Sequence, residues 1–467
     1  MLPVPLPPED VCRRARLARD PRFDGRFIVG VLTTGVFCRP VCPARAPAED
    51  NVRYFATAAA ALQAGYRPCL RCRPERARLL PSWTIASQTV GRALQRIEQG
   101  FLNTHPVREL AATVGVGERQ LSRLFRQELG ATPKGLARMQ RLALARRLLD
   151  DTDLSISDVA LCAGYGSLRR CNDELRRVFG RSPRELRRRG PADRPDALRL
   201  RLPFRSPWRA NWVFPFLARR ALSGLEEVTH NSLTRYVDGH AVSVQLDGDG
   251  VVLSVPPELS SATAAVVART RQVFDLDADP GAIDGHLGVQ PDLAAAVRAM
   301  PGIRVPGVWD PFEGAVKAVL GQQVRVDRAT VLATRLVAAY GDGAFPTPKA
   351  LVDADVASVG MPGARGQAVR NLARAVLDRG PDFLSDAGEV RPALLAIDGI
   401  GPWTAEYVAM RVAHDPDAFP ASDSAVRKAL DTTAVDAERR AEPGGPWRAY
   451  AVMYVWASGG TARPAPN

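Results

Sequence analysis

The sequence predicts a multidomain, mainly α-helical protein in which small sheets accompany the helices. Its 467 residues exceed the length of one ordinary core, which favours two to four domains of roughly 100–200 residues. Apolar residues recur at helical spacing over about residues 85–189 and again after residue 285, whereas the alternation typical of strands is confined to about residues 200–280. Two close cysteine pairs mark a further, small unit near the start.

Composition places the chain among soluble globular proteins. Hydrophobic residues make up 46% and charged residues 24% of the sequence, which excludes the disordered and fibrous classes. No apolar run approaches the roughly 20 residues that cross a bilayer, and the start, MLPVPLPPEDVCRRARLARD, lacks the pattern of a secretory signal. We therefore expect a cytoplasmic protein with no membrane partner, whose seven cysteines stay reduced.

The positive charge lies in the first half of the sequence. The chain has a net charge of +13, to which residues 1–200 contribute 36 Lys and Arg against 20 Asp and Glu. Nearly all of these basic residues are arginine, whose planar guanidinium suits phosphate contacts. The charge indicates a nucleic-acid partner, and a solvated arginine surface is the alternative that charge alone leaves open.

Four cysteines form two close pairs within one arginine-rich segment, TTGVFCRPVCPARAPAEDNVRYF followed by AGYRPCLRCRPER. The spacings are C-x3-C and C-x2-C, and the linker between the pairs has the length found in structural zinc sites. Buried cysteines that only fill the core are one alternative, and disulfides, which a reducing compartment disfavours, are another. We predict one zinc ion bound by Cys38, Cys42, Cys69 and Cys72. A metal-bound thiolate stays deprotonated near neutral pH and can also be a nucleophile.

This stretch resembles the N-terminal domain of the Ada family of alkylation-response regulators, over about residues 10–78. In that family the first cysteine of the FCRP motif accepts a methyl group irreversibly from a methyl phosphotriester in DNA. The resemblance implies that Cys38 is both ligand and methyl acceptor, while the other three cysteines are ligands. Methylation would remove one negative charge from the site and weaken its repulsion from DNA phosphates. Cys12 lies outside the pattern, and we expect it only to pack.

Two similar helical segments follow. HPVRELAATVGVGERQLSRLFRQELGATP and LSISDVALCAGYGSLRRCNDELRRVFGRSP each read as a helix, a glycine turn, a basic helix and a G-x-[ST]-P terminus. This pattern is typical of a helix-turn-helix unit, whose second helix can enter a major groove, and a generic helical linker is the alternative. The pair resembles the AraC-type DNA-binding domain over about residues 85–189. The residues expected to face the groove are Arg119, Gln120, Arg123, Arg169, Arg170 and Asn172.

A charged, proline-containing stretch, RRRGPADRPDALRLRLPFRSP, predicts a linker after the second unit. Beyond it, alternation in YVDGHAVSVQLDGDGVVLSV predicts an antiparallel sheet with a turn at DGDG. We predict four domains: an α+β zinc domain at 1–80, an all-α double helix-turn-helix domain at 81–190, an α+β domain at 191–285 and an all-α domain at 286–467.

The last segment contains a glycine hairpin between two helices, LLAIDGIGPWTAEYVAMRVA, and an acid further on in HDPDAFPASDSAVRKAL. The N–H groups of the hairpin at Gly399 and Gly401 suit a DNA phosphate, although the same motif caps many ordinary helices. Asp423 directly precedes an amphipathic helix, where an N-cap is the routine role of Asp. Each feature alone therefore has a purely structural alternative.

Together these motifs resemble the helix-hairpin-helix DNA glycosylase superfamily and, more closely, the AlkA family of alkylated-base glycosylases. PFEGAVKAVLGQQVRV, GIGPWTAEYVAMR and PWRAYAVMYVW carry the resemblance. It implies that Asp423 is catalytic and stabilises an oxocarbenium sugar. Trp403, Tyr407 and Trp456 would hold the flipped base, with core packing as the alternative. Gln323 would wedge into the DNA stack, where the AlkA family has an apolar residue.

The resemblance also indicates which chemistry is missing. Bifunctional members of the superfamily have a lysine directly after the hairpin, where this chain has Trp403, so we expect hydrolysis without strand cleavage. The segment has no cysteine, so we expect no iron–sulfur cluster.

These expectations describe one DNA repair protein. Methyl transfer would convert it to a transcriptional activator, and its glycosylase would hydrolyse the N-glycosidic bond of 3-methyladenine and 7-methylguanine. The partners would be alkylated and promoter double-stranded DNA in the nucleoid, and RNA polymerase. The alternative is a transcription factor whose glycosylase domain only adds DNA affinity.

Overall fold

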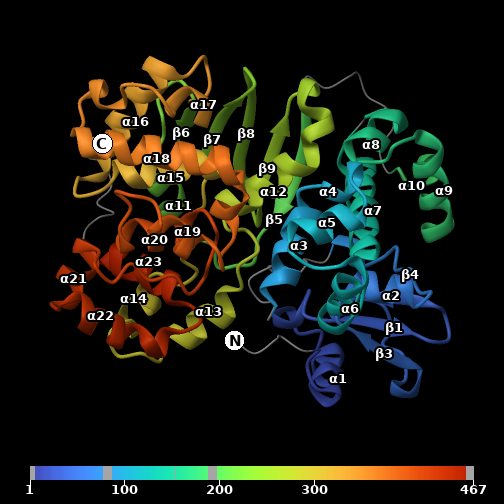
Figure 1. Cartoon of the computed structure of the whole chain (residues 1–467). Helices are drawn as coiled ribbons and strands as arrows, with labels where there is room; N and C mark the ends of the chain where they lie inside the picture. The colour runs from blue at the N-terminus through green and yellow to red at the C-terminus, as the bar shows by residue number, and fades with distance from the viewer. Residues whose placement is uncertain (1–5, 77–86, 153, 188–196, 459–467) are drawn as a thin grey trace. The chain divides into compact units, whose positions relative to one another are not determined.

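Helices dominate the chain, as the sequence predicts. The computed structural model describes residues 6–76, 87–152, 154–187 and 197–458. It divides into two compact units, one formed by Met1–Leu200 with Val255–Ala268 and the other by Arg201–Ser254 with Arg269–Asn467. Figure 1 shows the helices and the strands of both units. None of the helices within the described ranges is long and apolar enough to span a membrane.

The first unit begins with a four-stranded sheet flanked by short helices. The strand order is β3-β1-β2-β4, in which β1 is antiparallel to β2 and β3, and β2 is parallel to β4. Cys12 is fully buried against Phe27 and Val29, so it packs as expected. The elements are α1 (Glu9–Ala18), η1 (Pro21–Phe23), β1 (Ile28–Val31), β2 (Val36–Cys38), η2 (Glu49–Asn51), β3 (Val52–Phe55), α2 (Ala58–Gln63), β4 (Arg67–Pro68) and η3 (Pro74–Arg76).

The rest of the first unit contains two helix-turn-helix units, α5–α6 and α8–α9, with the long helix α7 between them. Gly115 and Gly164 in the two turns have φ of +73° and +80°, a conformation that glycine adopts without strain. Thr132 and Ser182 of the G-x-[ST]-P motifs cap the helices that follow. The elements are α3 (Gln88–Glu98), α4 (Phe101–Thr104), α5 (Val107–Thr113), α6 (Glu118–Leu129), α7 (Pro133–Asp151), α8 (Ile156–Cys162), α9 (Leu168–Phe179) and α10 (Pro183–Leu186).

The second unit contains the sheet that alternation predicts. Its strand order is β5-β9-β8-β7-β6, and the pairs β6–β7, β7–β8 and β8–β9 are antiparallel. The DGDG sequence forms the turn between β8 and β9, where Gly248 has φ of +57°. The strands are β5 (Leu198–Pro203), β6 (Glu226–Val228), β7 (Ser232–Val237), β8 (His240–Asp247) and β9 (Gly250–Val255).

The predicted linker is wrong over its second half. Residues 188–196 of that stretch lie outside the described residues, but LRLRLP forms the strand β5. Leu198, Leu200 and Leu202 are buried on one face of this strand, and arginines alternate with them. The charged residues and prolines of the stretch are typical of a linker, so the short alternation of a strand within it was not recognised.

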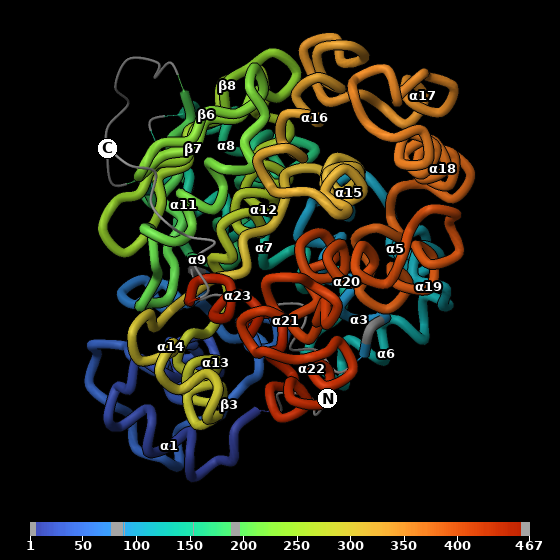
Figure 2. Tube along the Cα trace, turned by 90° about the vertical axis from the view of Figure 1, so that its left-hand side faces the viewer, coloured from blue at the N-terminus to red at the C-terminus, as the bar shows by residue number. Residues whose placement is uncertain are grey.

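Helices build the remainder of the chain, of which residues 255–268 belong to the first unit and the rest to the second. Figure 2 shows α15, α18, α19 and α20 gathered together, and α15 contacts both α18 and α20. Nearly every residue of α15 is buried, which makes it the central helix of this bundle. The elements are α11 (Ala210–Ala218), η5 (Pro257–Ala262), α12 (Thr263–Val273), α13 (Pro280–Leu287), α14 (Ala294–Ala299), α15 (Pro311–Leu320), α16 (Val326–Tyr340), α17 (Pro348–Leu351), η6 (Val356–Val359), α18 (Gly363–Arg379), η7 (Pro381–Ser385), α19 (Val390–Leu395), α20 (Pro402–Arg411), α21 (Ser424–Leu430), α22 (Ala434–Ala441), η8 (Glu442–Gly444) and α23 (Arg448–Ser458).

Candidate functional site

The four paired cysteines meet at one edge of the first sheet. Cys38 ends β2 and Cys69 directly follows β4, and because these strands are parallel neighbours their carboxyl ends lie together. A turn after β2 brings Cys42 back toward Cys38, and in this turn the N–H of Cys42 donates to the carbonyl of Arg39 at 3.1 Å. With Cys72, the four sulfur atoms all lie within 4.8 Å of one another.

This cluster fits a tetrahedral zinc ion. With Zn–S bonds of about 2.3 Å, the sulfur atoms of a tetrahedral site lie about 3.8 Å apart. Hydrogen bonds with the other three thiols, together with burial, raise the pKa of Cys38. A divalent cation would supply the opposite charge that four crowded thiolates require. The backbone N–H of Arg39 also donates to the sulfur of Cys72 at 3.4 Å, which supports the negative charge expected there.

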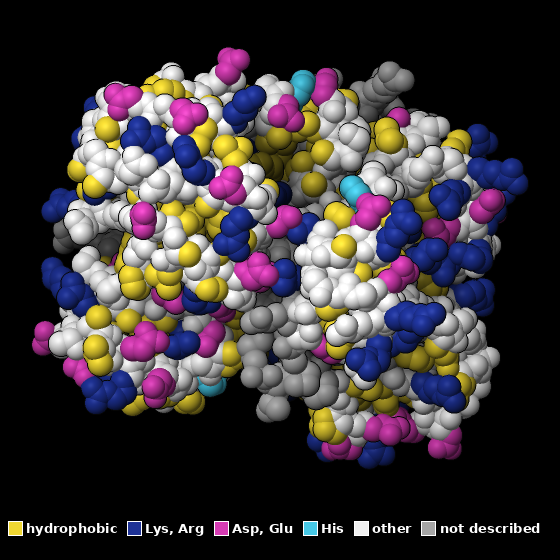
Figure 3. Space-filling view, in the orientation of Figure 1, with side chains coloured by type: hydrophobic (Ala, Val, Ile, Leu, Met, Phe, Trp, Pro, Cys, Tyr) yellow, Lys and Arg dark blue, Asp and Glu magenta, His cyan; other side chains and the backbone are white. Residues whose placement is uncertain are grey.

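The predicted groove-facing residues lie on the second helix of each helix-turn-helix unit. Those on α6 are all exposed, and on α9 the two arginines are exposed while the asparagine is half-buried. Figure 3 shows Lys and Arg side chains gathered over this part of the first unit, as a surface for nucleic acid requires. The residues are Arg119, Gln120 and Arg123 on α6, and Arg169, Arg170 and Asn172 on α9.

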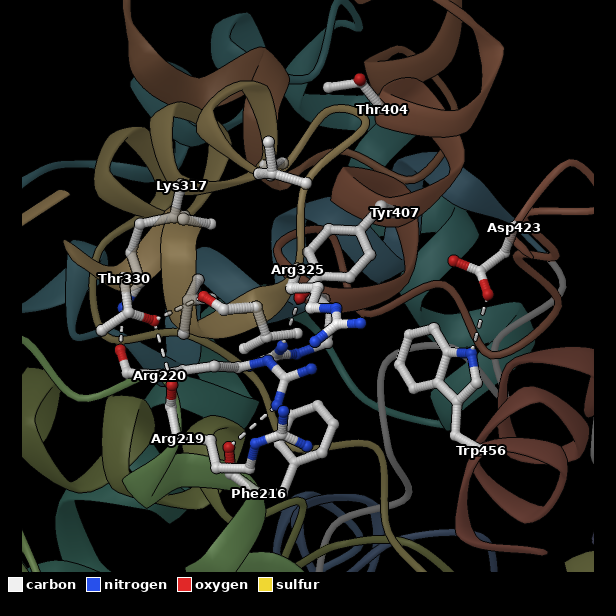
Figure 4. A pocket seen from close by; sticks show the side chains of 18 of the residues that line it. Phe216, Arg219, Arg220, Lys317, Arg325, Thr330, Thr404, Tyr407, Asp423 and Trp456 are labelled. Carbon is white, nitrogen blue, oxygen red and sulfur yellow. Dashed lines mark hydrogen bonds between the residues drawn. The ribbon is translucent and has the colours of Figure 1, made fainter. Parts of the chain in front are cut away.

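A pocket of about 1250 Å³ opens in the second unit, and Figure 4 shows it from close by. Its wall is built from α11, α15, α20, α21 and α23 and from the loops that follow α15 and precede α20. All of the residues predicted for a glycosylase site line it. They are Gln323, Gly399, Gly401, Trp403, Tyr407, Asp423 and Trp456.

Asp423 is the N-cap of α21, and it also faces the pocket. Its Oδ1 accepts hydrogen bonds from the N–H groups of Ala425 and Val426 at 3.0 and 3.1 Å. The indole Nε1 of Trp456 donates to the same oxygen at 3.1 Å, and that of Trp403 donates to Oδ2 at 2.9 Å. The capping role predicted from sequence is therefore correct, and it accounts for only two of the four hydrogen bonds to this carboxylate.

The aromatic side chains beside Asp423 form two stacked pairs. Trp403 and Tyr407 stack with ring centroids 5.2 Å apart, and Phe216 and Trp456 stack at 6.4 Å. Tyr407 and Trp456 connect the two pairs in a tilted contact at 6.3 Å. Phe216 lies on α11, far in the sequence from its stacking partner Trp456 on α23, and the sequence analysis did not identify it. Its only sequence signal is the apolar run NWVFPFLA, which is equally typical of a core helix.

Several cationic side chains also line the pocket, and the sequence analysis did not identify them. The guanidinium of Arg220 lies 3.6 Å from the ring centroid of Phe216, and that of Arg411 lies 4.7 Å from it. Arg411 also donates to the hydroxyl of Tyr407 at 2.9 Å. Burial acts to raise the pKa of Tyr407, but the positive charges of Arg411 and Arg220 outweigh it and lower the pKa to about 8. Lys317 donates to the carbonyl of Arg220 at 2.8 Å.

The hairpin and the predicted wedge lie at the edge of the same pocket. Gly399 has φ of +89°, and Gly401 is the N-cap of α20. Gln323 is exposed in the loop between α15 and α16, with φ of +55°, a strained conformation for a residue other than glycine. The side-chain amide of Gln322 donates to the carbonyl of Gly399 and to the hydroxyl of Thr404, both at 3.0 Å, so this loop is fixed to the hairpin.

Four known families match consecutive parts of the chain. Residues 11–75 match the metal binding domain of Ada, and residues 110–189 match a helix-turn-helix domain. Residues 199–310 match the AlkA N-terminal domain, and residues 316–441 match the HhH-GPD superfamily of base excision DNA repair proteins.

Individual proteins extend these matches. The "Bifunctional transcriptional activator/DNA repair enzyme Ada" of Escherichia coli is 38% identical over 32% of this chain and 40% of its own. The "DNA-3-methyladenine glycosylase 2" of the same organism is 33% identical over 55% of this chain and 95% of its own. The "Probable bifunctional transcriptional activator/DNA repair enzyme AlkA" of Mycobacterium tuberculosis is 41% identical over 95% of both chains. The chain therefore belongs to the family of bifunctional transcriptional activator and DNA repair proteins in which an Ada metal-binding domain and a helix-turn-helix domain precede an AlkA glycosylase.

Proposed function

We propose that this chain removes alkylated purines from DNA as a monofunctional glycosylase and accepts methyl groups from DNA phosphotriesters at Cys38. The observation that carries the glycosylase proposal is the carboxylate of Asp423, which is fixed by four N–H donors at the wall of an aromatic pocket. The methyl-acceptor proposal is supported by the four-cysteine cluster within the matched Ada domain.

Excision needs a negative charge close to the sugar. A purine alkylated at N3 or N7 is cationic, so the C1′–N bond breaks with its electron pair passing to the base, which leaves neutral. The sugar becomes an oxocarbenium ion, which the carboxylate of Asp423 stabilises. Water then forms a bond to C1′ and gives its proton to solvent. Trp403, Tyr407 and Trp456 offer ring faces to the cationic base, because the face of an aromatic ring attracts positive charge.

The DNA around the lesion would contact the edge of the pocket. The hairpin at Gly399 and Gly401 presents N–H groups to a phosphate at the N-terminus of α20. Gln323, exposed at the tip of its loop, occupies the stack that the flipped nucleotide leaves. Since Trp403 stands where a Schiff-base lysine would be needed, the product is an abasic site in an intact strand.

Methyl transfer would take place at the cysteine cluster. Cys38, Cys42, Cys69 and Cys72 would hold one zinc ion, which keeps the sulfur of Cys38 a thiolate near neutral pH. That sulfur attacks the methyl carbon of the phosphotriester, the C–O bond breaks, and its electron pair returns to the phosphate as a negative charge. The sulfur becomes a thioether, so the cluster has one negative charge fewer, and the helix-turn-helix surface binds promoter DNA more tightly. The bound protein would then recruit RNA polymerase.

Two measurements on the 467-residue chain test the proposal. Incubation with methylated duplex DNA should release 3-methyladenine and 7-methylguanine and leave strands that break only after alkali treatment. Promoter affinity of the methylated and unmethylated protein across a salt series should differ most at low salt, where charge is least screened. A protein that binds methylated DNA without releasing any base would instead be a transcription factor whose second unit only adds DNA affinity.

A further inference from the structure

We infer that Trp403 and Trp456 position Asp423 through their indole N–H groups and leave Oδ2 as the oxygen that faces the sugar. This inference rests on the proposed role of Asp423 in excision. This role of the two tryptophans is separate from stacking on the base. The edge of each indole ring, which carries the N–H group, contacts Asp423, whereas stacking uses the face of the ring.

The two oxygens of Asp423 have different surroundings. Oδ1 accepts three hydrogen bonds, from the N–H groups of Ala425 and Val426 and from the indole of Trp456. Within the described ranges, Oδ2 accepts one hydrogen bond, from the indole of Trp403 at 2.9 Å. An ionised carboxylate has about four acceptor sites, two on each oxygen. Oδ1 is therefore saturated, and Oδ2 keeps the unshared electron pair that can approach a developing positive charge.

Burial fixes the indole of Trp456 in its donor orientation, and stacking supports that of the half-buried Trp403. The ring of Trp456 is only 7% exposed and stacks on Phe216, and its N–H points at Asp423 in Figure 4. Trp403 stacks on Tyr407 at an interplanar angle of 24°. A donor whose ring cannot turn holds the carboxylate at one angle, which is the preorganisation that electrostatic stabilisation of a transition state requires.

Trp403 also connects the carboxylate to the hairpin. It is the second residue of α20, directly after the hairpin glycines, and Gln322 bonds both to Gly399 and to Thr404 beside it. DNA that docks on the hairpin therefore contacts the segment that sets the orientation of Oδ2.

The test uses variants that keep an aromatic ring and lose only the N–H. Trp403→Phe and Trp456→Phe should each lower the single-turnover rate of 7-methylguanine release about tenfold or more, the scale of one hydrogen bond to a charged group. Trp403→Phe should have the larger effect, because Oδ2 then has no donor, whereas Oδ1 keeps two backbone donors without Trp456. The Kd for a duplex holding a tetrahydrofuran abasic analogue should change less than twofold. Trp208→Phe is the matched control, since its indole donates to the carbonyl of Phe274 and lies outside the pocket wall.

A double-mutant cycle separates positioning from stacking. In the Asp423→Asn background, the tryptophan variants should cause little further loss, because they act only through the carboxylate. Two results would overturn the inference while the glycosylase function stands. One is that each tryptophan variant lowers the excision rate by the same factor in the Asp423→Asn background as in the wild type, and the other is that the Phe variants excise bases as fast as the wild type. If Asp423→Asn excises bases as fast as the wild type, both the catalytic role and the inference are wrong.

A spectroscopic measurement that does not depend on base excision tests whether the two indole N–H groups contact Asp423. In ¹H–¹⁵N spectra of tryptophan-labelled free protein, Asp423→Asn should shift the indole resonances of Trp403 and Trp456 and leave that of Trp208 unchanged. Unmoved resonances would overturn the inference even if the protein is active. A wild-type protein that releases no base would overturn the proposed function, and these spectra would still show whether the indoles bind the carboxylate.

Discussion

The guanidinium of Arg73 forms an ion pair with the carboxylate of Asp150, 77 positions later in the chain. Arg73 directly follows Cys72, and Asp150 lies at the end of α7, where Arg146 pairs with it at 2.9 Å. Arg146 also donates to the carbonyl of Leu186 in α10 at 2.7 Å. A continuous set of contacts therefore joins the cysteine cluster to α10, the helix that follows the second helix-turn-helix unit.

Removing the shared acid should destabilise the first unit. Asp150→Ala removes the carboxylate with which two largely buried guanidinium groups, those of Arg73 and Arg146, form ion pairs, and breaking such a buried pair costs about 3–5 kcal/mol. We expect the free energy of unfolding of the first unit to fall by this amount, which lowers the denaturant concentration at its unfolding midpoint. The control is Asp10→Ala, whose ion pair with Arg14 is exposed and contributes little. Equal midpoints for the two variants would show that the buried pair does not stabilise the unit.

Methyl transfer should modify one cysteine only. After incubation with DNA that contains methyl phosphotriesters, mass spectrometry should find a single added methyl group, on Cys38. Cys38→Ser should prevent the modification, because a serine hydroxyl is not ionised near neutral pH. Cys12→Ser is the control, since Cys12 is buried in a separate cluster and burial raises its pKa to about 11. A methyl group on Cys69 or Cys72 would contradict the assignment.

The hairpin offers a matched pair of glycine variants. Gly399 has φ of +89°, and an added Cβ would lie 2.6 Å from the Cβ of Ala368, so Gly399→Ala should cost about 1–3 kcal/mol of stability. It should also weaken binding to damaged and undamaged duplexes alike, because the hairpin contacts phosphate and not the lesion. Gly401 has φ of −98° and open space around it, so Gly401→Ala should lower the melting temperature less, by the cost of alanine at the N-cap alone. A pair of variants with the same melting temperature would refute this account.

Tyr407 should titrate at an unusually low pH. The guanidinium of Arg411 beside its hydroxyl lowers the pKa of Tyr407 to about 8, whereas a tyrosine in the unfolded chain ionises near 10. Between pH 8 and 10 the folded protein therefore holds a phenolate that the unfolded chain lacks, and the folded state gains stability as the pH rises. Absorbance near 295 nm should show one tyrosine that ionises near pH 8 and is missing from Tyr407→Phe. Identical titration curves would contradict the prediction.

Sequence reasoning identified those residues of both sites that lie close together along the chain. The four cysteines form two close pairs, and the strands β2 and β4 bring these pairs together in the way the spacing predicts. The hairpin glycines and Asp423 are likewise tied to local turns and caps, whose requirements are visible in a few consecutive residues.

Contacts between distant elements could not be predicted in this way. Phe216 lies on α11 and Arg220 lies just after that helix, and helical periodicity shows that α11 has an apolar face without showing what the face contacts. The hydrogen bonds from Trp403 and Trp456 to Asp423 span 20 and 33 positions, and they depend on how three helices pack. The strand β5 was missed because its leucines alternate with arginines in a stretch otherwise typical of a linker.

Replacing Asp423 by Asn separates its two roles. Asn caps a helix about as well as Asp, and its single carbonyl oxygen can take the place of Oδ1 and accept from Ala425 and Val426. Its amide NH₂ group would then face the indole N–H of Trp403, donor against donor. The variant therefore loses both the negative charge and the contact that orients it, at a modest cost in stability.

Base excision by Asp423→Asn should consequently fall by about 10²-fold or more, the scale of one preorganised electrostatic partner. The melting temperature should drop by only a few degrees, and binding to methylated duplexes should persist, since the hairpin and the aromatic pocket remain. Single-turnover release of 3-methyladenine, recorded beside a thermal melt and an affinity measurement, checks all three outcomes. No strand nicking should appear in either protein, because Trp403 cannot form a Schiff base. Unchanged excision with an unchanged melt would leave Asp423 with its capping role alone.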